Sequence, residues 1–272
     1  SFYFAAITDS FVRTLNDNKC RVTTVLPSQL QTILDILDTQ HVNMAVIDSL
    51  GHVPLSEIFK SREIPFVHAF PDMDGDTAHG AVASVVMDVA PAFKALAKHC
   101  QASGVREVCV CPSPQAHPYV RKLAEAMDGR GIRCSFIGTG AGDEPAGRLE
   151  GVNMMELRGY RSAKALLGSK ERLPDMFLSM DDFFTRGMLV AFQDAGVDIP
   201  KDIQLVSLAN RGNIPVWRTP ISRIEHTPEK YGRLLAETCL RWFAKRRTYK
   251  PLLLRPKFIV GGTTWRNRRK RV

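Results

Sequence analysis

The chain has 272 residues, of which 44% are hydrophobic and 24% are charged, a balance typical of a globular protein. No apolar run approaches the ~20 residues that a membrane-spanning helix needs, which argues against a transmembrane protein. Six cysteines in a chain of this length do not make a disulfide framework and instead fit a reducing cytoplasm. The first residues also lack the basic segment and cleavage site of an intact secretory signal, although an upstream signal could have been removed.

The net charge is +9, from 37 basic and 28 acidic residues. Part of the excess is local, because Lys245-Arg246-Arg247 closes a predicted helix and the segment Arg266–Arg271 is strongly basic. A basic balance is typical of proteins that work near nucleic acid. For residues 266–272 themselves, a solvated basic tail is the favoured interpretation.

Apolar spacings predict alternating helices and strands along the chain. Phe4, Ile7, Phe11 and Leu15 recur every three or four residues, which predicts a first helix. Further helices are predicted to run to Leu37 with Ser28 as the cap, at Leu55–Lys60, from Asp88, from Pro118 to before Gly129, after Gly159-Tyr160 to about Leu167, from Asp182 to Gly196, and from Pro228 to about Lys245. Strands are predicted at Arg21–Leu26, Val42–Ile47, Ile64–Ala69, Ala83–Met87, Arg106–Cys111, Ile132–Ile137, Met176–Met180, Ile203–Leu208, Ile221–Glu225 and Leu252–Val260.

This alternation predicts an α/β fold with parallel sheets and helices on both faces. The strands are too many for one comfortable sheet of this length, so two doubly wound lobes are expected. The most informative unit runs from Met176 to Leu208, because a polar pair, Asp181-Asp182, stands where a predicted strand passes into a helix. Ligands of open parallel sheets bind at such carboxyl ends of strands. We therefore expect Asp181 to be a ligand contact and Asp182 to be a helix cap, although both could be only caps.

The amino-acid sequence of this unit resembles that of the effector domain of LacI/GalR family transcription regulators. In that family a strand is followed by Asn-Asp, a helix with Gly six residues after the Asn, then Ala-Gly and a (Val/Ile)-Pro-x-Asp-(Val/Ile) segment. The matching residues are Asp181-Asp182, Gly187, Ala195-Gly196 and Ile199-Pro200-Lys201-Asp202-Ile203. A second block, Thr219–Ile224 followed by a helix with Gly232, is similar to the family's PPLTTV…G segment.

The resemblance implies a periplasmic-binding-protein-like fold in which the chain crosses between lobes three times. It places residues 1–113 plus 223–250 in an N-terminal lobe and 114–222 plus 251–265 in a C-terminal lobe, with 266–272 as the basic tail. The family's domain begins with a strand before the first helix, and a DNA-binding helix-turn-helix lies further upstream. Neither is found in these 272 residues, so we expect the sequence to be a truncated piece.

The resemblance also implies a function. It predicts an effector-binding and dimerisation domain, working in the cytoplasm as a homodimer whose missing heads bind operator DNA. A small effector, such as a sugar or a related polar molecule, would bind between the lobes. The effector contacts that it implies are Tyr3, Phe4, Ser113, Gln115, Tyr119, Met154, Asp181, Asn210, Trp217 and His226.

Three departures from the family pattern bear on the ligand. Tyr119 stands where the family usually has Arg, Asp181 replaces Asn, and Ala209 replaces a common Asp. Losing a guanidinium and a bidentate acceptor puts the usual hexose contacts in doubt. A neutral polyol, an unusual saccharide or a cationic ligand is expected to fit better than an anion.

Two other classes of function stay open at this point. The first is a periplasmic sugar-binding protein of a transporter, which the Thr219–Ile224 segment, the cysteine usage and the basic charge argue against. The second is an enzyme, but no Gly-x-Ser-x-Gly elbow or other catalytic set occurs in the sequence. No metal site or cofactor is predicted.

Overall fold

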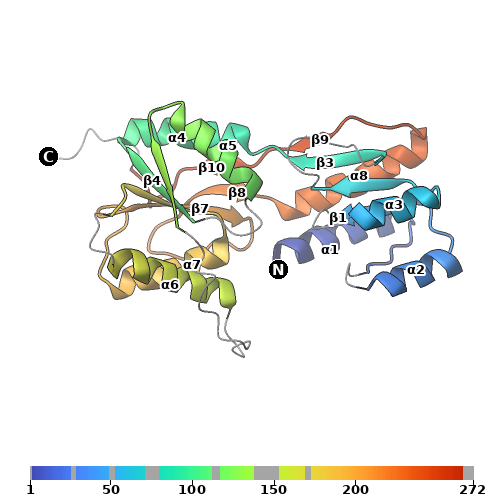
Figure 1. Cartoon of the computed structure of the whole chain (residues 1–272), viewed down its shortest axis with the longest axis horizontal. Helices are drawn as coiled ribbons and strands as arrows, with labels where there is room; N and C mark the ends of the chain where they lie inside the picture. The colour runs from blue at the N-terminus through green and yellow to red at the C-terminus, as the bar shows by residue number, and fades with distance from the viewer. Residues whose placement is uncertain are drawn as a thin grey trace. The chain divides into compact units, whose positions relative to one another are not determined.

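The computed structural model describes residues 2–25, 29–48, 53–70, 80–111, 117–137, 153–168 and 173–265. The chain folds into two compact α/β units (Figure 1). Unit 1 comprises Ser1–Asp88 and Thr227–Leu254, and unit 2 comprises Val89–His226 and Arg255–Val272. The expected α/β fold of two lobes with three crossings is therefore confirmed.

The first crossing lies about 25 residues before the predicted one. Residues 89–111 belong to unit 2, because helix α4 (Ala90–Ser103) contacts strand β10 (Lys257–Ile259) and strand β4 (Glu107–Cys111) pairs within the sheet of unit 2. The prediction that residues 1–113 form one lobe is thus wrong for this segment, and Ser113 itself lies outside the described residues. The other crossings, after His226 and after Leu254, lie within a few residues of the predicted ones.

Unit 1 is built on a four-stranded parallel sheet in the order β1, β2, β3, β9. These strands are Ala45–Asp48, Phe66–Ala69, Ala83–Met87 and Leu252–Leu254. Helix α1 (Phe2–Asp17) lies along helix α8 (Pro228–Lys245), as Figure 1 shows. Leu37 of α2 (Leu30–Thr39) and Leu55 and Phe59 of α3 (Val53–Ser61) pack on a core with Ile47 and Phe66.

One strand and one helix start of unit 1, and the start of the first helix of unit 2, differ from the predictions. Residues 21–25 form no strand, because nothing in the described sheet pairs with their backbone groups, and a strand needs such a partner. Helix α2 begins after Gln29, which makes no side-chain cap, and Ser28 lies outside the described residues. Helix α4 begins at Ala90 rather than Asp88, whose N–H donates to Leu254 O.

Unit 2 is built on a six-stranded sheet in the order β10, β8, β7, β6, β4, β5. Its strands include β5 (Arg133–Phe136), β6 (Met176–Ser179), β7 (Gln204–Asn210) and β8 (Ser222–His226). Among the described strands of this sheet, β10 alone is antiparallel to its neighbour, β8. Helices α4 and α5 (His117–Asp128) cover one face, and α6 (Met154–Gly168) and α7 (Asp182–Asp194) cover the other (Figure 1).

The predicted last strand, Leu252–Val260, is two strands in two sheets. Residues 252–254 pair with β3 in unit 1, and residues 257–259 pair with β8 in unit 2. Pro256, which has no N–H to donate to a ladder, stands between them. The sequence correctly predicted extended structure in this apolar run, but the pattern of apolar residues does not indicate which sheet each half joins.

Helices α6 and α7 approach each other at two glycines. A Cβ on Gly187 would lie 1.8 Å from the carbonyl oxygen of Glu156, and one on Gly159 would lie 2.0 Å from that of Phe184. Gly159 lies inside α6, which begins at Met154, whereas the sequence predicted that Gly159-Tyr160 would precede the helix. This close contact fixes the first turn of α6 beside the first turn of α7.

Candidate functional site

The carboxyl ends of three neighbouring strands in unit 2 carry polar side chains. Strand β6 ends at Ser179, just before Asp181, and strands β7 and β8 end at Asn210 and His226. Asn210 and His226 are paired in register, so their side chains are neighbours on one edge of the sheet. Three predicted site residues from distant parts of the sequence, Asp181, Asn210 and His226, are thus brought to one edge, as expected for parallel strands.

Asp181, and not Asp182 as predicted, is the N-cap of α7. Its Oδ1 accepts from the N–H of Phe184 at 2.8 Å, while the hydroxyls of Ser179 and Thr185 donate to its carbonyl oxygen at 2.9 and 2.8 Å. Burial raises the pKa of the Asp181 carboxyl, and the N–H groups of the first turn oppose that change. Among the described residues the geometric hydrogen bond to this carboxylate goes to Oδ1, so Oδ2 can accept a hydrogen bond from a ligand.

Asp182 has a structural role in the same edge. Its side chain is 1% exposed, and its Oδ2 accepts from both the N–H and the Nδ2 of Asn210, at 3.2 and 2.9 Å. These two bonds tie α7 to the end of β7 and fix the orientation of the Asn210 amide. The amide oxygen of Asn210 is then the atom left to accept from outside.

His226 and Tyr119 add two neutral rings. Their centroids are 6.5 Å apart, with planes inclined at 42°. Burial lowers the pKa of His226 to about 4 and raises the pKa of Tyr119 to about 12, so both are uncharged at neutral pH. The edge therefore offers carboxylate and amide acceptors beside neutral rings, and the nearby guanidinium of Arg186 lowers the pKa of Asp181 in part.

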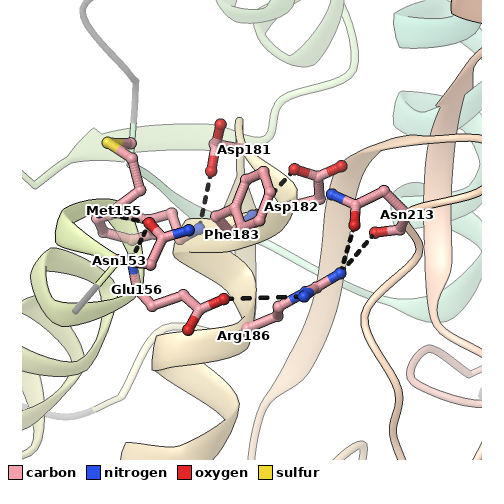
Figure 2. Close-up of polar contacts among 9 residues, drawn as sticks. Asn153, Met155, Glu156, Asp181, Asp182, Phe183, Arg186 and Asn213 are labelled. Carbon is pink, nitrogen blue, oxygen red and sulfur yellow. Dashed lines mark hydrogen bonds and ion pairs between the residues drawn. The ribbon is translucent and has the colours of Figure 1, made fainter. Parts of the chain in front are cut away.

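A second polar group, which the sequence did not predict, joins α6, α7 and the loop after β7. Figure 2 shows Arg186 between Glu156 and Asn213. Arg186 Nη2 donates to the Oδ1 and the carbonyl oxygen of Asn213 at 2.6 and 3.3 Å, and Nη1 lies 3.8 Å from Glu156 Oε1. The position of Arg186, one turn into the helix after Asp182, was the only sequence signal that could have indicated it.

Unit 1 carries an aromatic cluster, and this too gains a residue that was not predicted. Phe70, the first residue after β2, stacks on Tyr231 of α8, with centroids 4.1 Å apart and planes at 3°. The predicted residues Tyr3 and Phe4 lie 5.9 and 6.2 Å from the Phe70 ring. The Tyr231 hydroxyl anchors the stack, because it donates to Val85 O at 2.6 Å and accepts from the N–H of Phe70 at 2.8 Å.

The other predicted contacts remain predictions. Ser113 and Gln115 lie outside the described residues. Met154 begins α6, where the N–H groups of the next two residues donate to Asn153 (Figure 2), but no contact of Met154 with Asp181 is recorded. Trp217 packs against the hydrophobic core of unit 2 and carries the guanidinium of Arg218 5.4 Å from its ring centroid.

The described residues hold no group of three or more His, Cys, Asp or Glu side chains suited to a metal ion. Among the helices of the described ranges, none combines the length and the apolar character needed to cross a bilayer. The chemistry that the edge of unit 2 does support is recognition of hydroxyl or ammonium donors by Asp181 and Asn210, beside the rings of Tyr119 and His226.

A protein-family profile described as "Periplasmic binding protein-like domain" matches residues 97–264, more than half of the chain. No curated protein matches the sequence. Among solved structures, the fold is similar to LacI family transcriptional regulators from Bifidobacterium animalis subsp. lactis (17% identity, TM-score 0.76) and from Arthrobacter sp. FB24 in complex with lactose (16%, 0.74). A third, from Enterococcus faecium with bound ribose, has 16% identity and a TM-score of 0.74.

The alignments with these three regulators cover 96–97% of this chain and 94% of each of theirs. Sequence identity this low shows a common fold, and the family profile shows the common ancestry of residues 97–264. The chain belongs to the periplasmic-binding-protein-like domain family, and it has the fold of the LacI family regulators.

Proposed function

We propose that the chain is the effector-binding domain of a LacI-type transcription regulator, and that its effector is a small neutral or cationic molecule rich in hydroxyl or ammonium donors. The observation that carries the proposal is the carboxyl edge of unit 2. There Asp181 Oδ2 and the Asn210 amide oxygen are both available as acceptors beside two uncharged rings.

The character of this edge favours a saccharide or polyol over an anion. A carboxylate attracts hydroxyl and ammonium donors and repels phosphate or carboxylate groups. Burial of Asp181 raises its pKa, and a donor from the ligand would restore the charged form, since hydrogen bonds to a carboxylate lower its pKa. Ligand binding is therefore expected to release a fraction of a proton when the pH is close to the pKa of Asp181.

Unit 1 supports the same proposal with apolar surface. Tyr3, Phe4 and Phe70 are half-buried and supply aromatic carbon, which saccharide ligands contact with their C–H faces, while the fully buried Tyr231 holds the Phe70 ring in place from behind. The sequence-based prediction that the ligand lies between two lobes remains a prediction.

The further roles follow from the proposed class of protein. As in a LacI-type regulator, the chain would act in the cytoplasm as a homodimer, and ligand would change the affinity of attached DNA-binding heads for an operator. The similarity to structures of transcription regulators favours this proposal over the transport alternative. Sedimentation equilibrium of the purified chain tests the dimer, and a monomer at micromolar concentration would contradict it.

Isothermal titration with a panel of pentoses, hexoses, disaccharides, polyols and polyamines tests the effector class. We expect at least one of them to bind with a Kd in the micromolar range or below. For that ligand, Asp181→Ala should weaken binding roughly 10- to 200-fold, because a hydrogen bond to a charged group contributes about 1.5–3 kcal/mol.

Asp128→Asn is the matched control, because Asp128 is an exposed carboxylate at the C-terminal end of α5, whereas Tyr119 lies near the start of that helix. It should leave the Kd unchanged. Equal affinity of the wild type and Asp181→Ala would remove Asp181 from the site. Binding of organic phosphates or dicarboxylates in place of the neutral and cationic panel would overturn the proposed ligand class.

A further inference from the structure

The end of helix α8 in unit 1 carries a concentrated positive charge. Residues 241–250 contain five basic side chains and no acidic one: Arg241, Lys245, Arg246, Arg247 and Lys250. All five are exposed, and none forms an ion pair with a carboxylate of the described residues. We call these five side chains the α8 basic cluster.

Three of the five are arginines held against aromatic rings. The Arg246 guanidinium lies 4.5 Å from the ring centroid of Trp242, and those of Arg241 and Arg247 lie 5.7 and 5.4 Å from that of Tyr249. Cation–π contacts of this kind restrict the arginine rotamers, so less conformational entropy is lost when they bind a partner. The planar fork of each guanidinium stays available to a tetrahedral anion.

The loop after α8 is itself held in place. The Tyr249 N–H donates to Val82 O at 3.0 Å, and the Tyr249 hydroxyl donates to Arg241 O at 3.2 Å. Both bonds set the ring of Tyr249 beside the last turn of α8. The arginines are therefore mounted on a fixed support at the amino-terminal side of β3.

Helix stability alone does not explain the cluster. The negative end of a helix dipole favours cations in the last turn, which accounts for Lys245, but Arg247 and Lys250 lie beyond the helix. Arg246 moreover occupies a left-handed conformation (φ 49°, ψ 38°) at the C-terminus of α8, where glycine carries no steric penalty. An arginine at this position lowers the stability of the backbone relative to glycine. We take a function of its side chain to be what compensates for that loss.

We propose that the α8 basic cluster is a sequence-independent contact for the phosphate backbone of duplex DNA. Five exposed cations within ten residues attract phosphate groups whatever the base sequence, and the aromatic rings already contact guanidinium groups rather than standing open to bases. A membrane surface fits less well, because Trp242, Phe243 and Tyr249 are half-buried and offer no exposed apolar wedge. This inference does not depend on the proposed effector.

Fluorescence anisotropy with a labelled 20-base-pair duplex of arbitrary sequence, titrated at 50–200 mM NaCl, is the test. The basic residues among Arg266–Arg271 are first changed to Gln in the full chain, because their charge would also attract DNA. In this background three to five phosphate contacts predict a log–log salt slope of about −2.7 to −4.5. Arg241→Gln/Arg246→Gln/Arg247→Gln should reduce its magnitude by about 2.7 and weaken binding at 50 mM NaCl at least roughly tenfold.

The matched control removes three exposed arginines of unit 2, Arg106, Arg130 and Arg161, by the same change to Gln. It should reduce binding far less, and an equal loss would show a general effect of net charge and overturn the proposal. Arg246→Gly separates folding from binding, since it should raise the urea midpoint while lowering the slope by about 0.9. Absence of salt-dependent duplex binding, or binding of the cluster to phosphatidylserine vesicles alone, would also overturn it.

Discussion

Acidification is expected to destabilise unit 2 through His226. This side chain is 7% exposed, and burial lowers its pKa from 6.5 to about 4. Below pH 6.5 the unfolded chain binds a proton there that the folded chain does not, so the stabilising contribution present above pH 6.5 is lost as the pH falls towards 4. The separation between these values, at about 1.36 kcal/mol per pH unit, corresponds to about 3 kcal/mol.

Asp181 and His99 also change the pH dependence of the free energy of unfolding, and their effects must be separated from that of His226. Burial raises the pKa of Asp181, so its contribution is lost as the pH rises and recovered on acidification, opposite in sign to that of His226. Burial lowers the pKa of His99, which adds to the loss on acidification. The slope of the wild type alone therefore does not report on His226, whereas the difference between wild type and a His226 variant does.

Urea unfolding followed by far-UV circular dichroism, at intervals from pH 7.5 to pH 4.5, measures that difference. We expect the free energy of unfolding of the wild type to fall by about 2–3 kcal/mol more than that of His226→Gln over this range. Exposed His41→Gln is the control and should parallel the wild type. Parallel curves for wild type and His226→Gln would refute the reasoning, because they would mean that His226 keeps its ordinary pKa in the folded chain.

Three substitutions test the contacts that position the candidate site. Gly187→Ala should cost about 1–3 kcal/mol or more, measured by urea unfolding, because its Cβ would lie 1.8 Å from the carbonyl oxygen of Glu156. Asp182→Ala should cost about 3 kcal/mol by the same measurement, since it leaves three N–H donors, one of Phe183 and two of Asn210, without their acceptor. Tyr231→Phe should lower the thermal midpoint by several degrees, because the hydroxyl bond to Val85 O, worth about 1 kcal/mol, is lost.

Each substitution has a matched control in the chain. Gly168→Ala places a Cβ where nothing lies within 4 Å, so it should be neutral or slightly stabilising. Asp128→Ala removes an exposed carboxylate, and Tyr249→Phe removes a hydroxyl whose 3.2 Å bond to Arg241 O is exposed to solvent, so both should change stability by less than about 0.5 kcal/mol. A Gly187→Ala chain as stable as Gly168→Ala would mean that α6 and α7 can separate without cost.

Local signals in the sequence located most elements correctly. The predicted strand Ala83–Met87 and the predicted helix Pro228–Lys245 agree with the structure at both ends. A short apolar run bounded by polar residues and a long amphipathic run opened by proline depend on local chemistry alone. The carboxyl-end rule predicted the position of Asp181 at a strand end, whereas Asn210 and His226 were predicted only through the family resemblance.

The errors share a physical cause, since each concerns a partner distant in the sequence. Residues 21–25 have the pattern of a strand but no described strand pairs with them. Asp181 rather than Asp182 caps α7 because Asp182 is held by Asn210, 28 positions away. A capping preference applies equally to both carboxylates, and only the neighbouring strand decides between them.

The local order of helices and strands, the α/β class and the likeness to one family were therefore all contained in residue spacing and a few short motifs, because these depend on chain periodicity and local turns. Three things were decided only by tertiary contact. Residues 89–111 joined unit 2 because β4 and α4 found their partners there. Phe70 and Arg186 became candidate site residues through Tyr231 and Asn213, which lie 161 and 27 positions away. Arg241 and Arg247 became neighbours on one surface because Tyr249, in the loop after α8, folds back against the last turns of that helix. Pairing of this kind is long-range, and no single stretch of sequence specifies it.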